Sequence, residues 1–210
     1  MDEDSAATRL AEARRETLLD AAVQVMRSGG VRAATTRTVT GTAGLPLGAF
    51  HYYFTAQDDL YAALLEREIR RALISAWIAV GEQGRSAELM RPDAGLEAAF
   101  LGYAAHLRRD PGYQLLIHEL IAVVARRSPA TASSTRLMVL TSVQDMIGQW
   151  SQSRGLSWSV PLDAVAGLVV ATATGIALSW LSTRDDAQAD ATGRAAAQAL
   201  ASLCRGHRGS

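Results

Sequence analysis

The residues TTRTVTGTAGLPLG, from Thr35 to Gly48, carry the strongest structural signal in this chain. Apolar residues on both sides of Ala43-Gly44-Leu45 recur at helical spacing, which predicts two short helices joined by a turn. Glycine permits a tight turn, and Thr35 or Thr36 can cap the first helix through its hydroxyl. The side chains expected to hold the two helices at a fixed angle are Val39, Leu45 and Phe50. The pattern therefore predicts a helix-turn-helix, whose second helix can enter a DNA major groove.

Helical periodicity extends along most of the remaining chain. It predicts about nine helices, near residues 8–28, 36–43, 47–53, 56–80, 93–109, 112–127, 130–153, 161–183 and 187–204. The five prolines each stand where a helical pattern begins, and Gly29 and Gly30 can close the first helix. The nearest strand candidate, Trp158–Val160, is too short to count. We therefore expect an all-α fold, with a small front unit at residues 1–55 and a larger helical body at residues 56–210.

The charge of the chain is balanced overall but not locally. The chain has 21 basic and 21 acidic residues and a formal net charge of +0, so it is not a polycation. All the basic residues are Arg, whose planar guanidinium suits phosphates. No Asp or Glu lies between Ala21 and Gln57, where Arg27, Arg32 and Arg37 are found. The predicted helix-turn-helix is thus locally basic, while the neutral whole predicts modest non-specific affinity for DNA.

Two features bear on the compartment. The single cysteine, Cys204, excludes an intrachain disulfide and suits a reducing setting, where we expect a partly buried thiol. The acidic, polar N-terminus does not resemble a targeting segment, so we expect a cytoplasmic protein. The 19 residues from Ala164 to Ser182 carry no charge and are long enough to cross a bilayer. Their Thr and Ser content and the absence of a flanking Arg cluster favour a core helix instead, and we expect no membrane partner.

The run ATTRTVTGTAGLPLGAFHYYFTAQDDLYAALL, from Ala34 to Leu65, resembles the tetracycline-repressor (TetR) family of bacterial regulators. The segment from Asp163 to Leu181 resembles the dimerisation helices of that family more loosely. The resemblance implies an N-terminal three-helix DNA-binding domain and a C-terminal helical domain that binds a ligand and dimerises. It also implies a homodimer on double-stranded DNA with a palindromic operator, and a small-molecule effector whose identity is open.

The resemblance assigns DNA contact to the start of the second helix and to the third. The residues concerned are Thr36, Arg37, Leu47, Gly48, Ala49, His51, Tyr52 and Tyr53. Arg37 can fork onto a phosphate or a guanine edge, Ala49 can meet a thymine methyl, and the Tyr52 hydroxyl can reach a phosphate. Core packing remains open for Leu47 and Tyr53 and is favoured for Phe54.

Two residues depart from the family pattern. His51 stands where the family often has Tyr, and Gln57 stands where it often has Lys. Both family residues usually meet the DNA backbone, so the missing charge at Gln57 predicts weaker affinity and a shallower salt dependence. A helical ligand-binding or interaction protein with weakened or lost DNA binding therefore stays open as an alternative.

Two faces of the helical body are candidates for dimerisation. Apolar residues line one helix at three-four-three spacing, and small residues line one side of the next, a combination that suits close helix packing. The residues are Leu140, Val143, Ile147, Trp150, Ala164, Gly167, Ala171 and Gly175. The resemblance favours an interface between two subunits, and an intramolecular core is the alternative.

The middle helices carry aromatic and polar residues that suit a cavity for a small apolar or aromatic ligand. They are Trp77, Phe100, Tyr103, His106, Tyr113, Leu116 and His118, and core packing explains most of them equally well. The chain lacks the common hydrolase, phosphate-loop and dinucleotide motifs, and its four histidines show no paired metal spacing. We therefore expect no catalytic residues, no metal and no cofactor.

Overall fold

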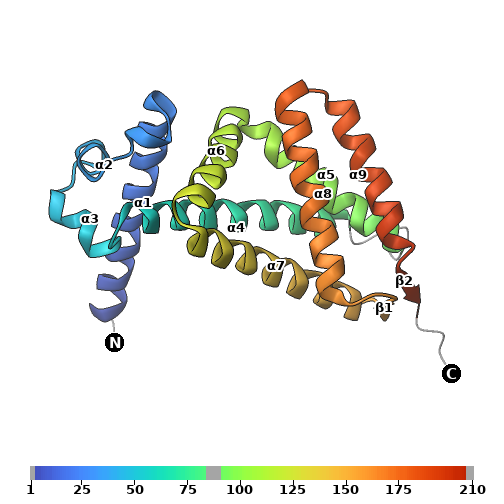
Figure 1. Ribbon diagram of the computed structural model, residues 1–210. Coiled ribbons are helices and arrows are strands. Elements are labelled where there is room, and N and C mark those ends of the chain that lie inside the picture. The colour runs from blue at the N-terminus through green and yellow to red at the C-terminus, as the bar shows by residue number, and fades with distance from the viewer. Residues whose placement is uncertain (1–2, 84–90, 207–210) are drawn as a thin grey trace. The chain divides into compact units, whose positions relative to one another are not determined.

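The computed structural model describes residues 3–83 and 91–206 (Figure 1). In this part of the chain there are nine α-helices, one 3-10 helix and two short strands. The α-helices are α1 Glu3–Gly29, α2 Thr36–Ala43, α3 Leu47–Tyr53, α4 Gln57–Gln83, α5 Pro92–Arg109, α6 Pro111–Arg127, α7 Pro129–Gln152, α8 Leu162–Thr183 and α9 Asp186–Ala201. The 3-10 helix η1, Val31–Ala33, joins α1 to α2. The predicted all-α fold is confirmed.

Local sequence signals explain where the front helices begin and end. Gly30 follows α1 with a φ of 77°, a conformation that suits glycine. Thr35 is the residue that caps α2: its hydroxyl accepts a hydrogen bond from the Thr38 amide at 3.2 Å, and its own amide donates to the Thr38 hydroxyl at 2.9 Å. This reciprocal cap satisfies amides that the first helical turn leaves without partners.

Two compact units make up the chain, and each has its own core. The first extends up to Glu68 and includes Gly112–Thr135, so it takes in the start of α4 and most of α6. Its fully buried side chains include Leu18, Leu19, Val39, Phe50, Leu60 and Tyr61. The unit therefore extends beyond the boundary expected at residue 55, because Leu60 and Tyr61 of α4 pack into the same core as Phe50 of α3.

The second unit consists of Ile69–Pro111 and the chain from Arg136 onward. Helix α5 packs closely on α9, since a Cβ at Gly193 would lie 3.2 Å from the Cβ of Phe100. Arg108 of α5 pairs with Asp186 at 2.9 Å and Asp190 at 2.6 Å, at the N-terminal end of α9. Apolar burial and these ion pairs hold the two helices together.

Helix α8 is long and apolar enough to span a membrane by length and composition, with a mean hydropathy of 1.9. One of its faces lies in the core of the second unit, where Val165, Ala166 and Ala177 are 0% exposed. The helix therefore buries one side as a core helix does and leaves its other side exposed.

A two-stranded antiparallel sheet was not predicted. Strand β1, Leu156–Trp158, pairs with β2, Cys204–Gly206, so that Trp158 lies opposite Cys204. Helix α9 accordingly ends at Ala201 and not near residue 204. Three-residue strands about fifty residues apart give no alternating pattern that the sequence alone could show.

The thiol of Cys204 makes the unfolding free energy of the second unit depend on pH. Burial raises its pKa to about 11 from an ordinary value of 9.0. Between these values the unfolded thiol loses its proton while the folded one keeps it, so the unfolding free energy falls as the pH rises through this window. We expect a Cys204→Ala variant to lose less stability than the parent between pH 9 and about 11 in urea denaturation. Parallel curves for the two proteins would show that the thiol titrates normally.

Candidate nucleic-acid interface

The turn between α2 and α3 has the geometry that the sequence predicted. Gly44 has a φ of 65° and ψ of 27°, the left-handed conformation that ends α2. The Leu45 amide donates to the Thr40 carbonyl at 3.0 Å, and Pro46 stands as the N-cap of α3. Val39 and Phe50 are 0% exposed. The angle between the two helices is therefore fixed by a glycine turn and by a shared core.

Helix α3 buries one face and exposes the other. Phe50 lies in the core, whereas Leu47 is 57% and Tyr52 77% exposed. Gly48 and His51 are exposed as well. Leu47 is therefore no core residue, and the exposed face carries apolar, aromatic and backbone groups suited to base edges and phosphates.

The other residues predicted to touch DNA differ in exposure. Arg37 on α2 is exposed, while Thr36 and Ala49 are half-buried. Tyr53 is half-buried, packs against the core of the first unit and stacks edge-on with Tyr52, with ring centroids 4.8 Å apart. Phe54 is 2% exposed, so its expected role in the core is confirmed.

The start of α4 holds the segment that leads into α2. The Tyr61 hydroxyl donates to the Val31 carbonyl at 3.1 Å, and the side-chain amide of Gln57 donates through Nε2 to the Ala34 carbonyl at 2.6 Å. Burial raises the pKa of the Tyr61 phenol, and the nearby guanidinium of Arg127 partly opposes the shift. The side-chain amide of Gln57 is thus engaged within the first unit, where it contacts Ala34, the residue just before the N-cap Thr35.

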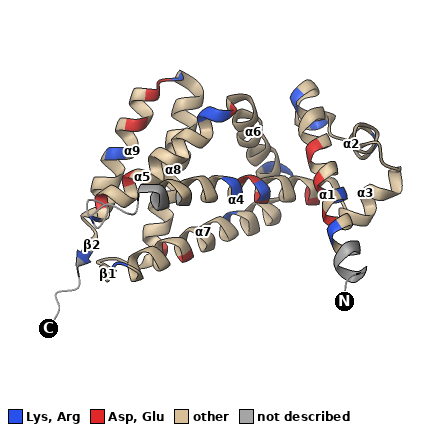
Figure 2. Ribbon diagram, turned by 180° about the vertical axis from the view of Figure 1, so that it is seen from behind, with Lys and Arg blue, Asp and Glu red and all other residues tan. Residues whose placement is uncertain are grey.

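Acidic groups are absent from α2 and α3, whose ribbons carry no red in Figure 2. The first acids after them are Asp58 and Asp59, in the first turn of α4. Asp58 pairs with Arg127 of α6 at 3.4 Å, and Asp59 accepts a hydrogen bond from the Ala56 amide at 2.9 Å. Both carboxylates are therefore engaged within the unit, and the α2–α3 surface presents no negative side chain to a phosphate backbone.

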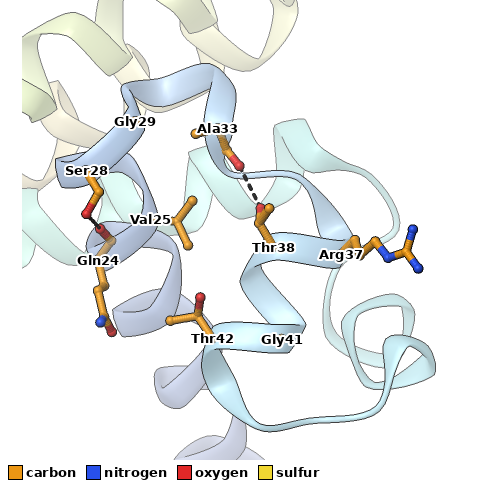
Figure 3. A pocket seen from close by; sticks show the side chains of 9 residues that line it. All are labelled: Gln24, Val25, Ser28, Gly29, Ala33, Arg37, Thr38, Gly41 and Thr42. Carbon is orange, nitrogen blue, oxygen red and sulfur yellow. Dashed lines mark hydrogen bonds between the residues drawn. The ribbon is translucent and has the colours of Figure 1, made fainter.

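A shallow groove of about 490 Å³ lies between the end of α1 and the side of α2 (Figure 3). Its lining is mixed: Gln24, Ser28, Thr38 and Thr42 are polar, whereas Val25 and Ala33 are apolar. In the figure the guanidinium of Arg37 points away from α1. The side chain is therefore directed outward, where a nucleic acid can reach it.

The residues predicted to line a ligand pocket do not share one core. Phe100, Tyr103 and His106 lie in the second unit, and Tyr113, Leu116 and His118 lie in the first. Core packing is the role that the structure gives Phe100, Tyr113 and Leu116, which are 4% to 7% exposed. The side chain of Trp77 lies outside the described part of the chain. Among the described residues, no group of His, Cys, Asp or Glu side chains is arranged to hold a metal ion.

The residues predicted to form a dimer interface divide into two groups. Val143, Ile147 and Trp150 of α7 are each 4% exposed and pack in the core of the second unit, beside half-buried Leu140. Their burial supports the alternative of an intramolecular core, because side chains that one chain already buries have little surface left for a second copy. On α8, the small residues Ala164, Ala171 and Gly175 are exposed and Gly167 is half-buried.

Two arginines organise the first unit in a way that the sequence did not reveal. Arg67 of α4 donates to Glu16 at 3.0 Å and to Asp20 at 2.7 Å, which ties α4 to α1. Arg127 of α6 contacts Asp58 and lies over the ring of Tyr61. These pairs join residues far apart in the chain, so no local spacing could have indicated them.

The geometry of α2 and α3 is that of a helix-turn-helix with one exposed helix face. Residues 18–64 match the family model described as bacterial regulatory proteins, tetR family. This match includes most of the residues 34–65 over which the sequence resembles the same family.

Individual proteins are similar to this chain as well. The chain is 41% identical over 61 residues to the HTH-type nicotine-responsive transcriptional repressor HdnoR of Paenarthrobacter nicotinovorans, a match over 27% of this chain and 31% of that protein. The chain thus matches about a third of the length of this curated relative. Among solved structures, the multidrug binding protein EbrR complexed with imidazole is 26% identical, with a TM-score of 0.63 over 90% of this chain and 89% of the other. A transcriptional regulator from Rhodococcus sp. Rha1 shares the fold, at 20% identity and a TM-score of 0.67 over 90% and 97%.

Proposed function

We propose that this protein is a homodimeric transcriptional repressor that binds a palindromic operator and is released from it by a small apolar or aromatic ligand. The observation that carries the proposal is the face of α3, where Leu47, Gly48, His51 and Tyr52 are exposed beside Arg37 with no acid nearby. Such a face fits a DNA major groove, and its paucity of charge makes shape-matched contacts more important than bulk attraction.

Selection of bound DNA from a random pool tests this proposal. We expect enrichment of a palindrome whose half-sites are about 10 to 10.5 base pairs apart, or a multiple of that distance. Absence of any enriched sequence, with folded protein in the assay, would favour the alternative of a helical ligand-binding protein that has lost DNA binding.

Dimerisation is supported by the outer face of α8. Leu168 is 48% and Leu178 51% exposed there, and the exposed residues Ala171 and Gly175 lie between them in the chain. Large apolar side chains next to small ones allow two helices to approach closely and bury apolar area. A second copy of the same face supplies a partner of matching shape, and a two-fold dimer places two recognition helices on one palindrome.

An acidic residue in the middle of this face should disrupt the dimer. We expect Ala171→Glu to raise the dimer dissociation constant at least about tenfold, because like charges would meet across the interface. Analytical ultracentrifugation measures the constant, and circular dichroism should show an unchanged helix content. The matched control is Ala125→Glu on α6, another exposed alanine, which should leave the dimer intact. Equal constants for both variants would place the interface elsewhere.

The ligand part of the proposal is supported by the names of two relatives. One is a nicotine-responsive repressor and the other a multidrug binding protein, so both are named for small organic molecules. We assign DNA binding to residues 1–55 and ligand binding and dimerisation to residues 56–210, in a cytoplasmic protein. Binding of ligand to a conformation with badly spaced recognition helices would release the operator.

Position 57 tests how the start of α4 meets DNA. We expect Gln57→Lys to steepen the dependence of operator affinity on salt by about 0.9 in the log-log slope, the effect of one more neutralised phosphate. Fluorescence anisotropy at several salt concentrations gives the slope. Gln57→Met is the control, since it keeps the side-chain length and adds no charge. If lysine leaves the slope unchanged, this position does not face the phosphate backbone.

A further inference from the structure

The guanidinium of Arg127, at the end of α6, lies against the start of α4. Its Nη2 atom is 3.4 Å from Oε1 of Gln57 and 3.4 Å from Oδ1 of Asp58. The same group lies over the ring of Tyr61, 5.7 Å from the ring centroid. Arg127 and Gln57 are 70 residues apart in the chain, so the fold of the first unit brings this charge to α4.

Two of the side chains that Arg127 contacts also hold the segment that leads into α2. Nε2 of Gln57 donates to the Ala34 carbonyl at 2.6 Å, and the Tyr61 hydroxyl donates to the Val31 carbonyl at 3.1 Å. Ala34 stands directly before the N-cap of α2. A helix N-terminus carries a partial positive charge and attracts phosphates. Arg127 therefore adds a full positive charge one side chain away from a segment that already favours an anion.

The contacts of Arg127 within the protein leave its guanidinium available to a ligand. The side chain is 45% exposed, and 3.4 Å is long for a hydrogen bond between charged groups, which usually measures about 2.7 to 2.9 Å. Oδ1 of Asp58 makes no hydrogen bond among the described residues. Arg67, by contrast, donates to Asp20 at 2.7 Å and is 10% exposed. An exposed, loosely formed ion pair adds little to stability, so stability alone does not explain an arginine at this position.

Positive side chains are scarce on the surface proposed to bind DNA. Arg37 is the only Arg or Lys in α2 and α3, and the sequence contains no other before Arg67. The first turn of α4 contains two acids, Asp58 and Asp59, and no Arg or Lys. Binding of duplex DNA relies on positive side chains that neutralise phosphates. Arg127 brings such a side chain to this end of α4 from α6.

We propose that Arg127 binds a phosphate of the DNA backbone beside the start of α2. Its planar guanidinium matches the oxygens of a phosphate, and the ring of Tyr61 orients it before DNA arrives. Asp58 is the competing anion, which the phosphate displaces from the guanidinium. The inference rests on the proposed DNA-binding function and extends the interface to α6, beyond residues 1–55.

The salt dependence of DNA binding tests this contact. A phosphate contact requires no particular base sequence, so the probe is a fluorescent DNA duplex of random sequence. Anisotropy titrations with the full-length protein at several salt concentrations give the log-log slope. We expect Arg127→Gln to make this slope shallower by about 0.9 for each bound subunit, and to weaken binding roughly 5- to 10-fold at about 0.1 M salt. Arg127→Lys keeps the charge and should keep most of the slope.

The matched control is Arg126→Gln. Arg126 is also exposed in the last turn of α6, but successive residues of a helix point about 100° apart, so its side chain is directed elsewhere. This variant should bind the duplex as the parent does. Circular dichroism verifies that both variants are folded. Equal salt slopes for Arg126→Gln and Arg127→Gln overturn the inference.

A second background separates phosphate binding from neutralisation of Asp58, whose charge repels DNA once Arg127 is removed. In a protein that carries Asp58→Asn this repulsion is absent, and Arg127→Gln should still make the slope shallower by about 0.9. A slope that Arg127→Gln leaves unchanged in this background overturns the inference, because the arginine then only screens Asp58.

Asp58→Asn by itself tests the contact if Arg127→Gln fails to fold. It removes the competing anion and frees the guanidinium, so it should tighten binding more than Asp59→Asn, which removes a charge from the same helical turn. Asp59 contacts the Ala56 amide, a bond that asparagine can also accept. Equal tightening by the two variants overturns the inference.

These measurements separate the contact from the proposed function. A slope that becomes shallower with Arg127→Gln supports the contact even when selection from a random pool yields no operator. An enriched palindrome that the parent and Arg127→Gln bind with the same slope would leave the repressor proposal intact and remove the contact.

Discussion

Replacing Phe50 with alanine should cost the first unit about 3 to 5 kcal/mol of unfolding free energy, the usual penalty for emptying a buried aromatic site. Phe50 is 0% exposed and contacts the ring of Phe54, with centroids 5.5 Å apart. It anchors α3 in the core that also contains Val39 of α2. The loss removes the contact that sets the angle between the two helices, so operator binding should fail together with stability.

Leu47→Ala provides the matched control on the same helix. Leu47 is 57% exposed, so its truncation should change the unfolding free energy by less than about 0.5 kcal/mol. Urea denaturation and limited proteolysis measure the stability of both variants. If Leu47 contacts a base, operator affinity should fall while stability does not. A Phe50→Ala protein as stable as the parent would contradict the packing of α3 described above.

The helix-turn-helix could be predicted from the sequence because its signals are local. Helices 36–43 and 47–53 have the predicted bounds, since Thr35, Gly44 and Pro46 act within a few residues of where they stand. A threonine cap, a left-handed glycine and a proline before a helix each restrict the backbone without help from distant residues. Because these local signals all favour the same structure, this part of the fold can be predicted from one sequence.

The roles of the apolar faces could not be predicted in the same way. The spacing of Val143, Ile147 and Trp150 indicates a buried face on α7, but periodicity does not say whether the same chain or a second one covers it. The structure shows that the same chain covers it, with α7 packed into the core of the second unit. The aromatic residues of the middle helices divide between two cores. This division could not be predicted either, because composition does not show which core a side chain packs in.

The close contact between Trp150 and Gly95 could not be predicted from the sequence either. A Cβ at Gly95 would lie 2.8 Å from Cζ2 of Trp150, so the contact depends on the missing side chain of the glycine. Gly95 and Trp150 lie on different helices and come into contact only when α5 and α7 pack together. A glycine within a helix is the sequence signal that could have indicated it, since such a glycine often marks close packing.

Arg37→Ala should weaken operator binding by about 1 to 3 kcal/mol, or roughly 5- to 150-fold, the range for loss of one arginine contact to a base or phosphate. Arg37 is exposed on α2 and its guanidinium points outward in Figure 3, so the variant should keep the stability of the parent. Gel-shift titration measures the loss, and Arg71→Ala, an exposed arginine of the second unit, is the control. A guanine contact predicts relaxed specificity at one operator position, whereas a phosphate contact predicts uniform weakening and a salt slope smaller by about 1. Unchanged affinity would remove the start of α2 from the interface and leave α3 alone to contact the operator.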